Sequence, residues 1–310
     1  MKKVKPFHKE CIITEENKLP DEILVIPNPI PKTNNGGISP ILKWAIAKIK
    51  ADIKNVVESS LCTKIQNVNG VSVSTIEHLM ATFNAFGIDN AIVKINSSEL
   101  PALDGSSCEY VKKIVSTGLK AQHQRKKVFK IVKKVQVKNG DRFISITPSD
   151  DLSINIAINY PKTIIGHSQY FYKHSKDNFI KNLSMARTYT LFEDIEKMRI
   201  AGLAIGGNLN NAIVVDKHKI LNPDGLRMDK EFVKHKTLDC IGDFYLLGMP
   251  LVGTVNCFAP GHNLNQLLIK EILKSKDNYT IIDIFTEEQP NNFFNLVDKN
   301  DATQKITCVA

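Results

Sequence analysis

Apolar residues follow two periodicities along this chain, and each predicts a different kind of element. Segments with apolar residues on one helical face predict helices at residues 109–116, 177–183, 191–201 and 230–247. A further helix is predicted to begin at the capping-box sequence Ser74-Thr75-Ile76-Glu77 and to stop at Gly87. Short runs rich in apolar and β-branched residues predict strands at residues 90–96, 212–215 and 251–258.

Alternation of apolar and polar residues becomes prominent after a polar, charged segment at residues 124–127, which we interpret as the domain boundary. It is clearest at residues 134–138 and recurs at 143–147 and 152–158, which predicts an antiparallel meander with one buried face. Each half of the chain therefore combines a small sheet with helices. The sequence predicts an α+β fold with domains at residues 1–123 and 124–290 and a C-terminal tail at 291–310.

The composition is that of a soluble globular protein, with 43% hydrophobic and 24% charged residues in a chain of 310. The net charge of +9 fits a nucleic acid, a nucleotide-linked substrate or a membrane surface as partner, or a general bias toward lysine. The lysine-rich stretch at residues 126–134 contains one aromatic residue, Phe129. This stretch is therefore more typical of the solvated face of a strand than of a nucleic-acid-binding patch.

Three observations bear on the compartment. The basic N-terminus is not followed by an apolar stretch, so no signal peptide is expected. Residues 244–269 lack Asp, Glu, Lys and Arg, but glycines, prolines and asparagines interrupt them, which argues against a transmembrane segment. The six cysteines form no CxxC pair, and their spacings show no regular pattern that would indicate a disulfide framework. We therefore expect a cytoplasmic protein in a reducing compartment.

The segment at residues 232–243 carries the most informative pattern of polar side chains. His235 and Asp239 are four residues apart, so they share a helix face and can chelate one ion. Asp243 lies one turn further along the same face, and apolar residues flank this polar stripe. Taken alone, however, this segment is more typical of an ordinary i,i+4 pair on a solvated face.

A second feature, Glu77-His78 in the first turn of the earlier helix, changes this interpretation. A lone histidine beside apolar residues is more often part of a core, and Glu77 also has a capping role. Together with His235 and Asp239, however, His78 completes a set of three nitrogen and oxygen ligands, which is typical of a catalytic zinc site with an open position. Glu77, beside a ligand, could then take a proton from water.

The third feature is the turn at residues 260–265, which contains His262 and precedes a helix. We expect this histidine to be exposed and mobile enough to protonate a leaving group, with the Asp243 carboxylate raising its pKa. A helix-capping polar turn is the alternative interpretation. The chain contains no Walker sequence, no GxGxxG and no GxSxG.

Several segments, taken together and in order, carry a resemblance to a known family. They are SVSTIEHLMATF (72–83), FGIDNAIV (86–93), ELPALDGSS (99–107), ARTYTLFEDIE (186–196), AIGGNLNNAIVVD (204–216), LNPDGLRMDKEFVKHKTLDCIGDFYLLG (221–248) and GHNLN (261–265). They resemble the bacterial UDP-3-O-acyl-N-acetylglucosamine deacetylases, the enzymes of the committed step in lipid A synthesis. The resemblance covers about residues 60–270.

This resemblance implies two α+β domains of similar topology, each a small mixed or antiparallel sheet layered with helices, with the active site in the cleft between them. It implies one zinc ion per chain on His78, His235 and Asp239, with ferrous iron as an alternative in the cell. Catalysis is implied for Glu77 as general base and for His262 as general acid.

The resemblance also assigns supporting roles. Asp243 would orient His262, and Thr188 would hydrogen-bond the oxyanion of the tetrahedral intermediate. Lys236 matches a lysine at the diphosphate end of the substrate. The candidate residues along a hydrophobic passage for the acyl chain are Tyr189, Ile195, Ala204 and Gly207.

The expected reaction is hydrolysis of the acetamide of UDP-3-O-(3-hydroxyacyl)-N-acetylglucosamine, which releases acetate. We expect a monomer that binds this small molecule and no nucleic acid. Two alternatives stay open. The first sixty residues depart from the family, since residues 10–19 lack its glycine and histidine turn, so a zinc hydrolase with a drifted substrate is one alternative. A non-catalytic or nucleic-acid-binding protein, explained by the +9 charge, is the other.

Overall fold

The structure is a computed structural model that describes residues 12–14, 22–25, 47–59, 61–95, 97–120 and 125–284. It contains helices and several small mixed or antiparallel sheets, which confirms the α+β prediction. The tail predicted at 291–310 lies outside the described residues, as do residues 121–124 at the predicted domain boundary. The division into two domains stays a prediction.

In its described residues, the first half of the chain contains two sheets and two α-helices. A four-stranded sheet has the order β1-β7-β2-β3, with β2 and β7 parallel and the other pairs antiparallel. Its strands are β1 (Ile12–Thr14), β2 (Glu22–Val25), β3 (Ala47–Lys50) and β7 (Ile92–Ile95). An antiparallel sheet consists of β4 (Val56–Val57), β5 (Lys64–Gln66) and β6 (Ser72–Val73). The helices are α1 (Glu77–Phe86) and α2 (Cys108–Thr117), and a single 3₁₀ turn, η1 (Ile53–Asn55), precedes them.

Within residues 125–284, the second half contains a seven-stranded sheet, four α-helices and a small inserted sheet. The seven strands are β8 (Lys126–Ile131), β9 (Val135–Asn139), β10 (Arg142–Thr147), β11 (Leu152–Tyr160), β12 (Gly166–Lys173), β16 (Leu251–Phe258) and β17 (Tyr279–Ile284). The helices are α3 (Lys176–Asn182), α4 (Phe192–Ile200), α5 (Glu231–Phe244) and α6 (His262–Leu273), with 3₁₀ turns η2 (Tyr245–Leu247) and η3 (Lys276–Asn278). The inserted sheet consists of β13 (Tyr189–Leu191), β14 (Ile213–Asp216) and β15 (Lys219–Ile220).

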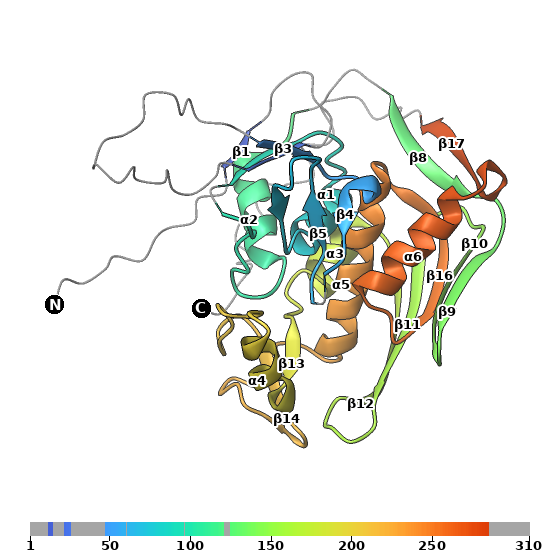
Figure 1. Ribbon diagram of the computed structural model, residues 1–310. Helices are drawn as coiled ribbons and strands as arrows, with labels where there is room; N and C mark the ends of the chain where they lie inside the picture. The colour runs from blue at the N-terminus through green and yellow to red at the C-terminus, as the bar shows by residue number, and fades with distance from the viewer. Residues whose placement is uncertain are drawn as a thin grey trace, which may run out of the picture.

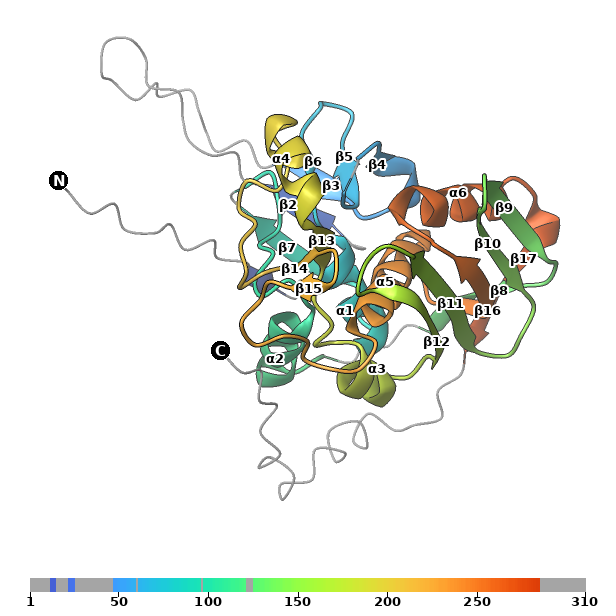
Figure 2. The same cartoon turned by 90° about the horizontal axis from the view of Figure 1, so that it is seen from below.

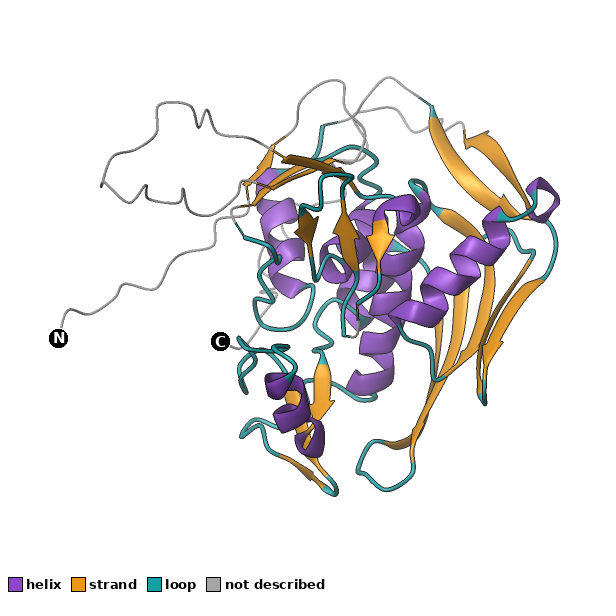
Figure 3. Cartoon of the chain, viewed as in Figure 1, coloured by secondary structure: helices purple, strands orange, loops and turns teal. Residues whose placement is uncertain are grey.

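Helices α1 and α5 lie at the centre of the molecule (Figure 1). The seven-stranded sheet lies on one side of them and the smaller sheets of the first half on the other (Figure 3). Helix α6 packs against β9 and β10, as the view from below also shows (Figure 2). The inserted sheet and α4 lie at one end of the molecule (Figure 1). None of the helices in the described part of the chain is long and apolar enough to cross a membrane.

The prediction of strand 251–258 is confirmed, but the predicted meander is wrong at one point. Strand β16 lies between β10 and β11, antiparallel to the first and parallel to the second. Its residues alternate between buried and partly buried positions, so one face of the strand packs on the core. Alternation defines a strand and its buried face, but it does not choose the neighbouring strand. The assumption that consecutive strands pair therefore failed between β10 and β11.

The predicted capping box at the start of α1 is also wrong. The helix begins at Glu77, its N-cap is Ile76, and no side chain caps it. Thr75 has a φ of +61°, which places it in the left-handed region outside the helix. The Glu77 carboxylate accepts a hydrogen bond from the Thr63 main chain. The helix ends as predicted, because Gly87 has a φ of +65° and closes the last turn.

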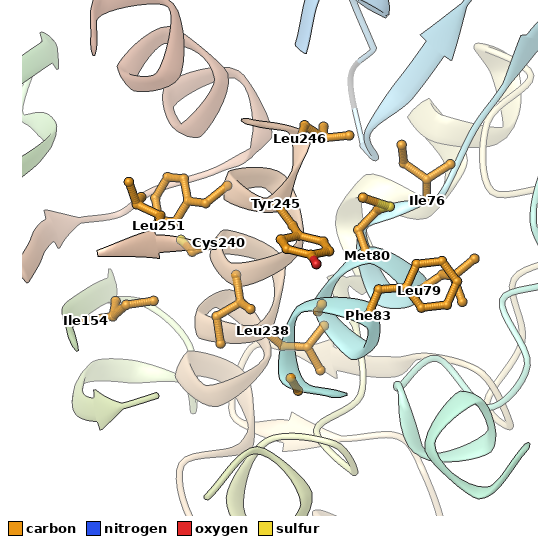
Figure 4. Packing of buried hydrophobic residues seen from close by; sticks show 14 of the residues in the cluster. Ile76, Leu79, Met80, Phe83, Ile154, Leu238, Cys240, Tyr245, Leu246 and Leu251 are labelled. Atoms are coloured by element: carbon orange, nitrogen blue, oxygen red, sulfur yellow. The ribbon is translucent and has the colours of Figure 1, made fainter. Parts of the chain in front are cut away.

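The core between α1 and α5 is apolar and tightly packed. Met80 from α1 lies close to Tyr245, which follows α5, and Leu238 of α5 belongs to the same buried cluster (Figure 4). All ten residues of α1 are buried. The two helices approach most closely at Gly242, where an added Cβ would lie 2.0 Å from the Glu77 carbonyl oxygen. A glycine is therefore required at this crossing.

Substitution of Gly242 by alanine should lower the free energy of unfolding by about 1–3 kcal/mol, because the methyl group forces the two helices apart. Urea unfolding followed by circular dichroism measures the change. Gly206→Ala is the matched control, since its φ is not in the left-handed region and an added Cβ there meets nothing within 4 Å. Equal stability of the two variants would show that the crossing tolerates a side chain.

Candidate metal centre

Three potential metal ligands from two helices meet at the α1–α5 crossing. His78 lies in the first turn of α1, and His235 and Asp239 lie on one face of α5. One ligand atom from each of these residues lies within 4.8 Å of the other two. All three side chains are buried, so the interpretation of His235 and Asp239 as a solvated surface pair is wrong.

The spacing of these atoms fits a single ion. Asp239 Oδ1 is 3.7 Å from His78 Nε2 and 3.4 Å from His235 Nε2. Ligands bound to one tetrahedral zinc at about 2.0–2.2 Å lie roughly 3.3–3.6 Å apart. Among the described residues no group hydrogen-bonds Asp239 Oδ1, although this atom is buried. A buried, unpartnered carboxylate oxygen between two imidazoles is what a cation would satisfy.

The orientation and protonation of the ligands also suit a metal. His235 Nδ1 lies 3.0 Å from the Ala186 carbonyl oxygen. Because a carbonyl only accepts, Nδ1 carries the proton and Nε2 keeps its lone pair. Burial, together with the nearby His235, lowers the pKa of His78 to about 3, and burial also lowers the pKa of His235. Both imidazoles are therefore neutral at pH 7.

Asp239 is held in its anionic form. Burial alone would raise the pKa of this carboxyl group, but the neighbouring His235 imidazole and Lys236 ammonium lower it well below its usual range. The Lys236 ammonium donates to Asp239 Oδ2 at 2.9 Å, which leaves Oδ1 on the side of the two histidines. Two neutral imidazoles and one carboxylate thus form the set that the sequence predicted.

Glu77 lies beside this set but takes no part in it. Its Oε2 accepts the hydrogen bond from the Thr63 N–H at 3.0 Å, and its Oε1 lies 3.8 Å from His262 Nε2. Burial raises the pKa of Glu77 to about 7, with the charge of His262 acting in the opposite direction. A carboxylate with this pKa can accept and release a proton near neutral pH.

His262 occupies the first position of α6, and the prediction that it is exposed and mobile is wrong. Its side chain is 10% exposed, and its Nδ1 donates to Asp243 Oδ2 at 2.9 Å. Burial alone would lower its pKa, but the carboxylates of Asp243 and Glu77 raise the pKa of His262 to about 10. Its Nε2 faces the metal ligands, 3.9 Å from Asp239 Oδ2. Asp243 is completely buried and contacts His262, as the family resemblance implied.

Lys236, Tyr189 and Thr188 are the candidates for contact with the substrate near the centre. Lys236 Nζ lies 5.7 Å from the centre of the Tyr189 ring, which also packs edge-on against Phe232. The Tyr189 hydroxyl donates to the Tyr160 hydroxyl at 3.2 Å. Thr188 is fixed through its main chain, since its N–H donates to the carbonyl of Gly105 and its own carbonyl accepts from the N–H of residue 213.

Ile195, Ala204 and Gly207 lie in the insert that follows β13. Ile195 is partly buried on α4, whereas Ala204 and Gly207 are exposed in one turn. Three further apolar side chains of the insert are strongly exposed: Phe192 at 54%, Ile200 at 81% and Ile205 at 82%. Sequence reasoning did not single them out, although exposed apolar groups of this size mark binding surfaces.

Two buried polar groups that support the site were also missed. Thr63 contacts both Glu77 and Asp243, yet a lone threonine before a three-residue strand carries no sequence signal. Arg187 forms a buried ion pair with Glu231, with Nε and Oε1 2.8 Å apart. This pair joins the segment that leads into β13 to the start of α5. Arg187 and Glu231 lie in segments that carry the family resemblance, which is the signal that could have found them.

Comparison with known proteins places this chain in a family. The family model described as UDP-3-O-acyl N-acetylglycosamine deacetylase matches residues 28–274. A UDP-3-O-acyl-N-acetylglucosamine deacetylase of a Nitratiruptor species is 40% identical over 259 residues, which cover 84% of this chain and 87% of the relative. Enzymes of that name from Campylobacter jejuni and Campylobacter hominis are 41% and 38% identical over 254 residues, covering 82% of this chain and 86% of each relative. The predicted resemblance is therefore confirmed, and the chain belongs to the UDP-3-O-acyl N-acetylglycosamine deacetylase family.

Proposed function

We propose that this chain hydrolyses the acetamide of UDP-3-O-(3-hydroxyacyl)-N-acetylglucosamine and releases acetate, the committed step of lipid A biosynthesis. One observation carries the proposal. Beside a buried set of two neutral imidazoles and one carboxylate lies His262, whose Nε2 is 3.9 Å from Asp239 Oδ2 and 3.8 Å from Oε1 of Glu77, the second group suited to acid–base catalysis. Hydrolysis of an unactivated amide requires both kinds of group. The names of the relatives supply the substrate.

Zinc is the metal that we assign to His78, His235 and Asp239, one ion per chain. Two imidazoles and a carboxylate form a three-ligand set of the type that catalytic zinc sites use. Ferrous iron accepts the same donors and is the alternative ion in the cell. When bound, the ion would act as a Lewis acid toward the acetamide carbonyl and would make water more acidic.

Glu77 serves as general base and His262 as general acid. Glu77 takes a proton from the water whose oxygen attacks the acetamide carbon. His262 then gives its Nε2 proton to the amine nitrogen as the carbon–nitrogen bond breaks and acetate leaves. The hydrogen bond from Nδ1 to Asp243 supports this role, because it keeps the imidazole cationic and its Nε2 directed at the centre.

Other residues bind the substrate or its transition state. Thr188, held at the start of the insert, hydrogen-bonds the developing oxyanion. Lys236 contacts the diphosphate end, and its raised pKa, which results mainly from Asp239 acting against burial, keeps it cationic. Tyr189, Ile195, Ala204 and Gly207 lie along the path of the acyl chain. The exposed apolar side chains of the same insert, Phe192, Ile200 and Ile205, support an apolar ligand there.

The proposed metal ligands and proton-transfer groups form a set within a single chain, and we propose a monomer as the functional unit. Its groups come from both halves of the sequence, which supports the proposed arrangement of two α+β domains around a shared site. The proposed boundary lies near residue 123.

Removal of a ligand tests the metal centre. Purified wild-type protein should contain about one zinc per chain, and His78→Ala should weaken zinc binding by more than roughly 100-fold, because losing even an outer partner of a ligand costs about 10–100-fold. Metal analysis after dialysis against a chelator gives both values. His218→Ala, at an exposed turn, should keep its zinc. Unchanged zinc content in His78→Ala would contradict the assigned ligand set.

Acetate release tests the reaction. The zinc-loaded enzyme should release acetate from the acylated UDP-sugar, and Glu77→Gln should lower kcat by about 10²–10⁴-fold, because the amide cannot take the proton from water. Glu109→Gln, in a surface pair with Lys112, should match wild type. If the wild type cleaves a different acetamide and leaves this substrate intact, the scaffold is a zinc hydrolase with a drifted substrate.

The pH dependence of kcat/KM should be bell-shaped. Glu77 acts in its deprotonated form, so the rate rises with pH through its pKa, which is about 7 in the metal-free protein. His262 acts in its protonated form, so the rate falls above its pKa, which is about 10. A bound cation lowers both pKa values, so the limbs should lie at or below these positions. His262→Gln should remove the alkaline limb alone, and its persistence would exclude His262 as the acid.

A further inference from the structure

Thr63 is a completely buried polar residue at the meeting point of the two proposed proton-transfer groups. It lies one residue before β5, in the first half of the chain, and its main-chain carbonyl accepts from the Ile76 N–H at the start of α1. The residue is therefore fixed to the helix that carries Glu77. No role in metal binding or proton transfer follows from its chemistry, because a threonine hydroxyl is neither acidic nor basic near neutral pH.

Thr63 forms hydrogen bonds with Glu77, the proposed base, and with the Asp243–His262 pair, the proposed acid. Its N–H donates to Glu77 Oε2 at 3.0 Å, and its hydroxyl donates to Asp243 Oδ1 at 2.5 Å. The same hydroxyl oxygen lies 3.2 Å from His262 Nδ1 and 3.4 Å from Gln266 Nε2, which donates to it. One residue thus contacts the carboxylate proposed as base and both members of the aspartate–histidine pair proposed as acid.

The hydroxyl contact fixes the second of the two Asp243 oxygens. Oδ2 accepts from His262 Nδ1 and from Asn265 Nδ2, at 2.9 and 2.8 Å. Oδ1 is bound only by Thr63 among the described residues. A buried carboxylate needs partners on both oxygens, and without Thr63 it could turn about its Cβ–Cγ bond toward another donor. The direction of the His262 ring would turn with it.

We propose that Thr63 is a positioning residue that sets the orientation of His262 relative to Glu77, through its hydroxyl contact with Asp243 and its main-chain contact with Glu77. The inference rests on the proposed roles of Glu77 and His262 as base and acid. Among the described residues Thr63 hydrogen-bonds neither a metal ligand nor His262 Nε2, the atom that would give up the proton, so its side chain acts through Asp243 and the His262 ring and its main chain through Glu77. A misplacement of about 1 Å in such a pair costs on the order of 100-fold in rate.

Paired substitutions separate the hydroxyl from the rest of the side chain. Thr63→Val keeps the shape and the main-chain N–H but removes the hydroxyl, whereas Thr63→Ser keeps the hydroxyl and removes a methyl group. At full zinc content, Thr63→Val should lower kcat by about 10–100-fold with KM within about twofold of wild type. Thr63→Ser should stay within about threefold of wild type. If Thr63→Val does not fold, Thr63→Ala provides the same test with the smaller side chain.

A measurement without substrate makes the outcome independent of the proposed reaction. In the zinc-loaded protein, the Nδ1–H of His262 should give a ring N–H resonance that exchanges slowly with solvent, assigned by its loss in His262→Gln. It should survive in Thr63→Ser and shift or exchange faster in Thr63→Val. An unchanged resonance in a folded Thr63→Val with full zinc content would overturn the proposal, as would equal losses of kcat in the valine and serine variants. If the wild type releases no acetate, the proposed function fails while the resonance still decides the role of Thr63.

Discussion

The crossing of α1 and α5 is the contact on which the rest of this site depends. Gly242 allows the α5 backbone to approach the Glu77 carbonyl, where any side chain would collide. His78 and Glu77 begin one helix, and His235 and Asp239 lie on the face of the other. The distances of 3.4 and 3.7 Å from Asp239 to the two imidazoles are therefore set by how closely the helices pack. A wider crossing would leave three ligands that no single ion could reach.

Local spacing predicted the parts of the site that one helix determines. His235, Asp239 and Asp243 follow a helical period, and the structure places all three on α5. Spacing could not join His78 to them, because that contact spans the two halves of the chain; the donor chemistry of a set of two histidines and one aspartate suggested it, and the family resemblance implied the same set. It also misassigned Glu77, since Ser74 and Glu77 match a capping box and the non-local donor, the Thr63 N–H, leaves no trace in the sequence. Strand 251–258 shows the same division, because its limits were predicted, whereas its position between β10 and β11 was not.

Burial is the second property that local sequence does not contain, and here it determines the chemistry. A histidine and an aspartate four residues apart on a solvated helix would form a weak pair with ordinary pKa values. In the structure all residues of α5 except Lys234 and Lys236 are buried, by α1 on one side and the large sheet on the other. Burial keeps the two ligand imidazoles neutral and raises the pKa of Glu77. At His262 the carboxylate of Asp243 outweighs the effect of burial, so the pKa of this histidine is raised. Similar side chains thus acquire different protonation states according to the partners they find.

The origin of each group explains why the halves of the chain act together. Thr63, Glu77 and His78 come from the first half, and His235, Asp239, Asp243 and His262 come from the second. Asp243 Oδ1, from the second half, is bound among the described residues only by Thr63, from the first half. Association of the halves satisfies this group and completes the ligand set in the same step. The hydrogen bond from Thr63 to Asp243 is therefore a polar contact between the halves that also fixes the partner of His262, the proposed acid.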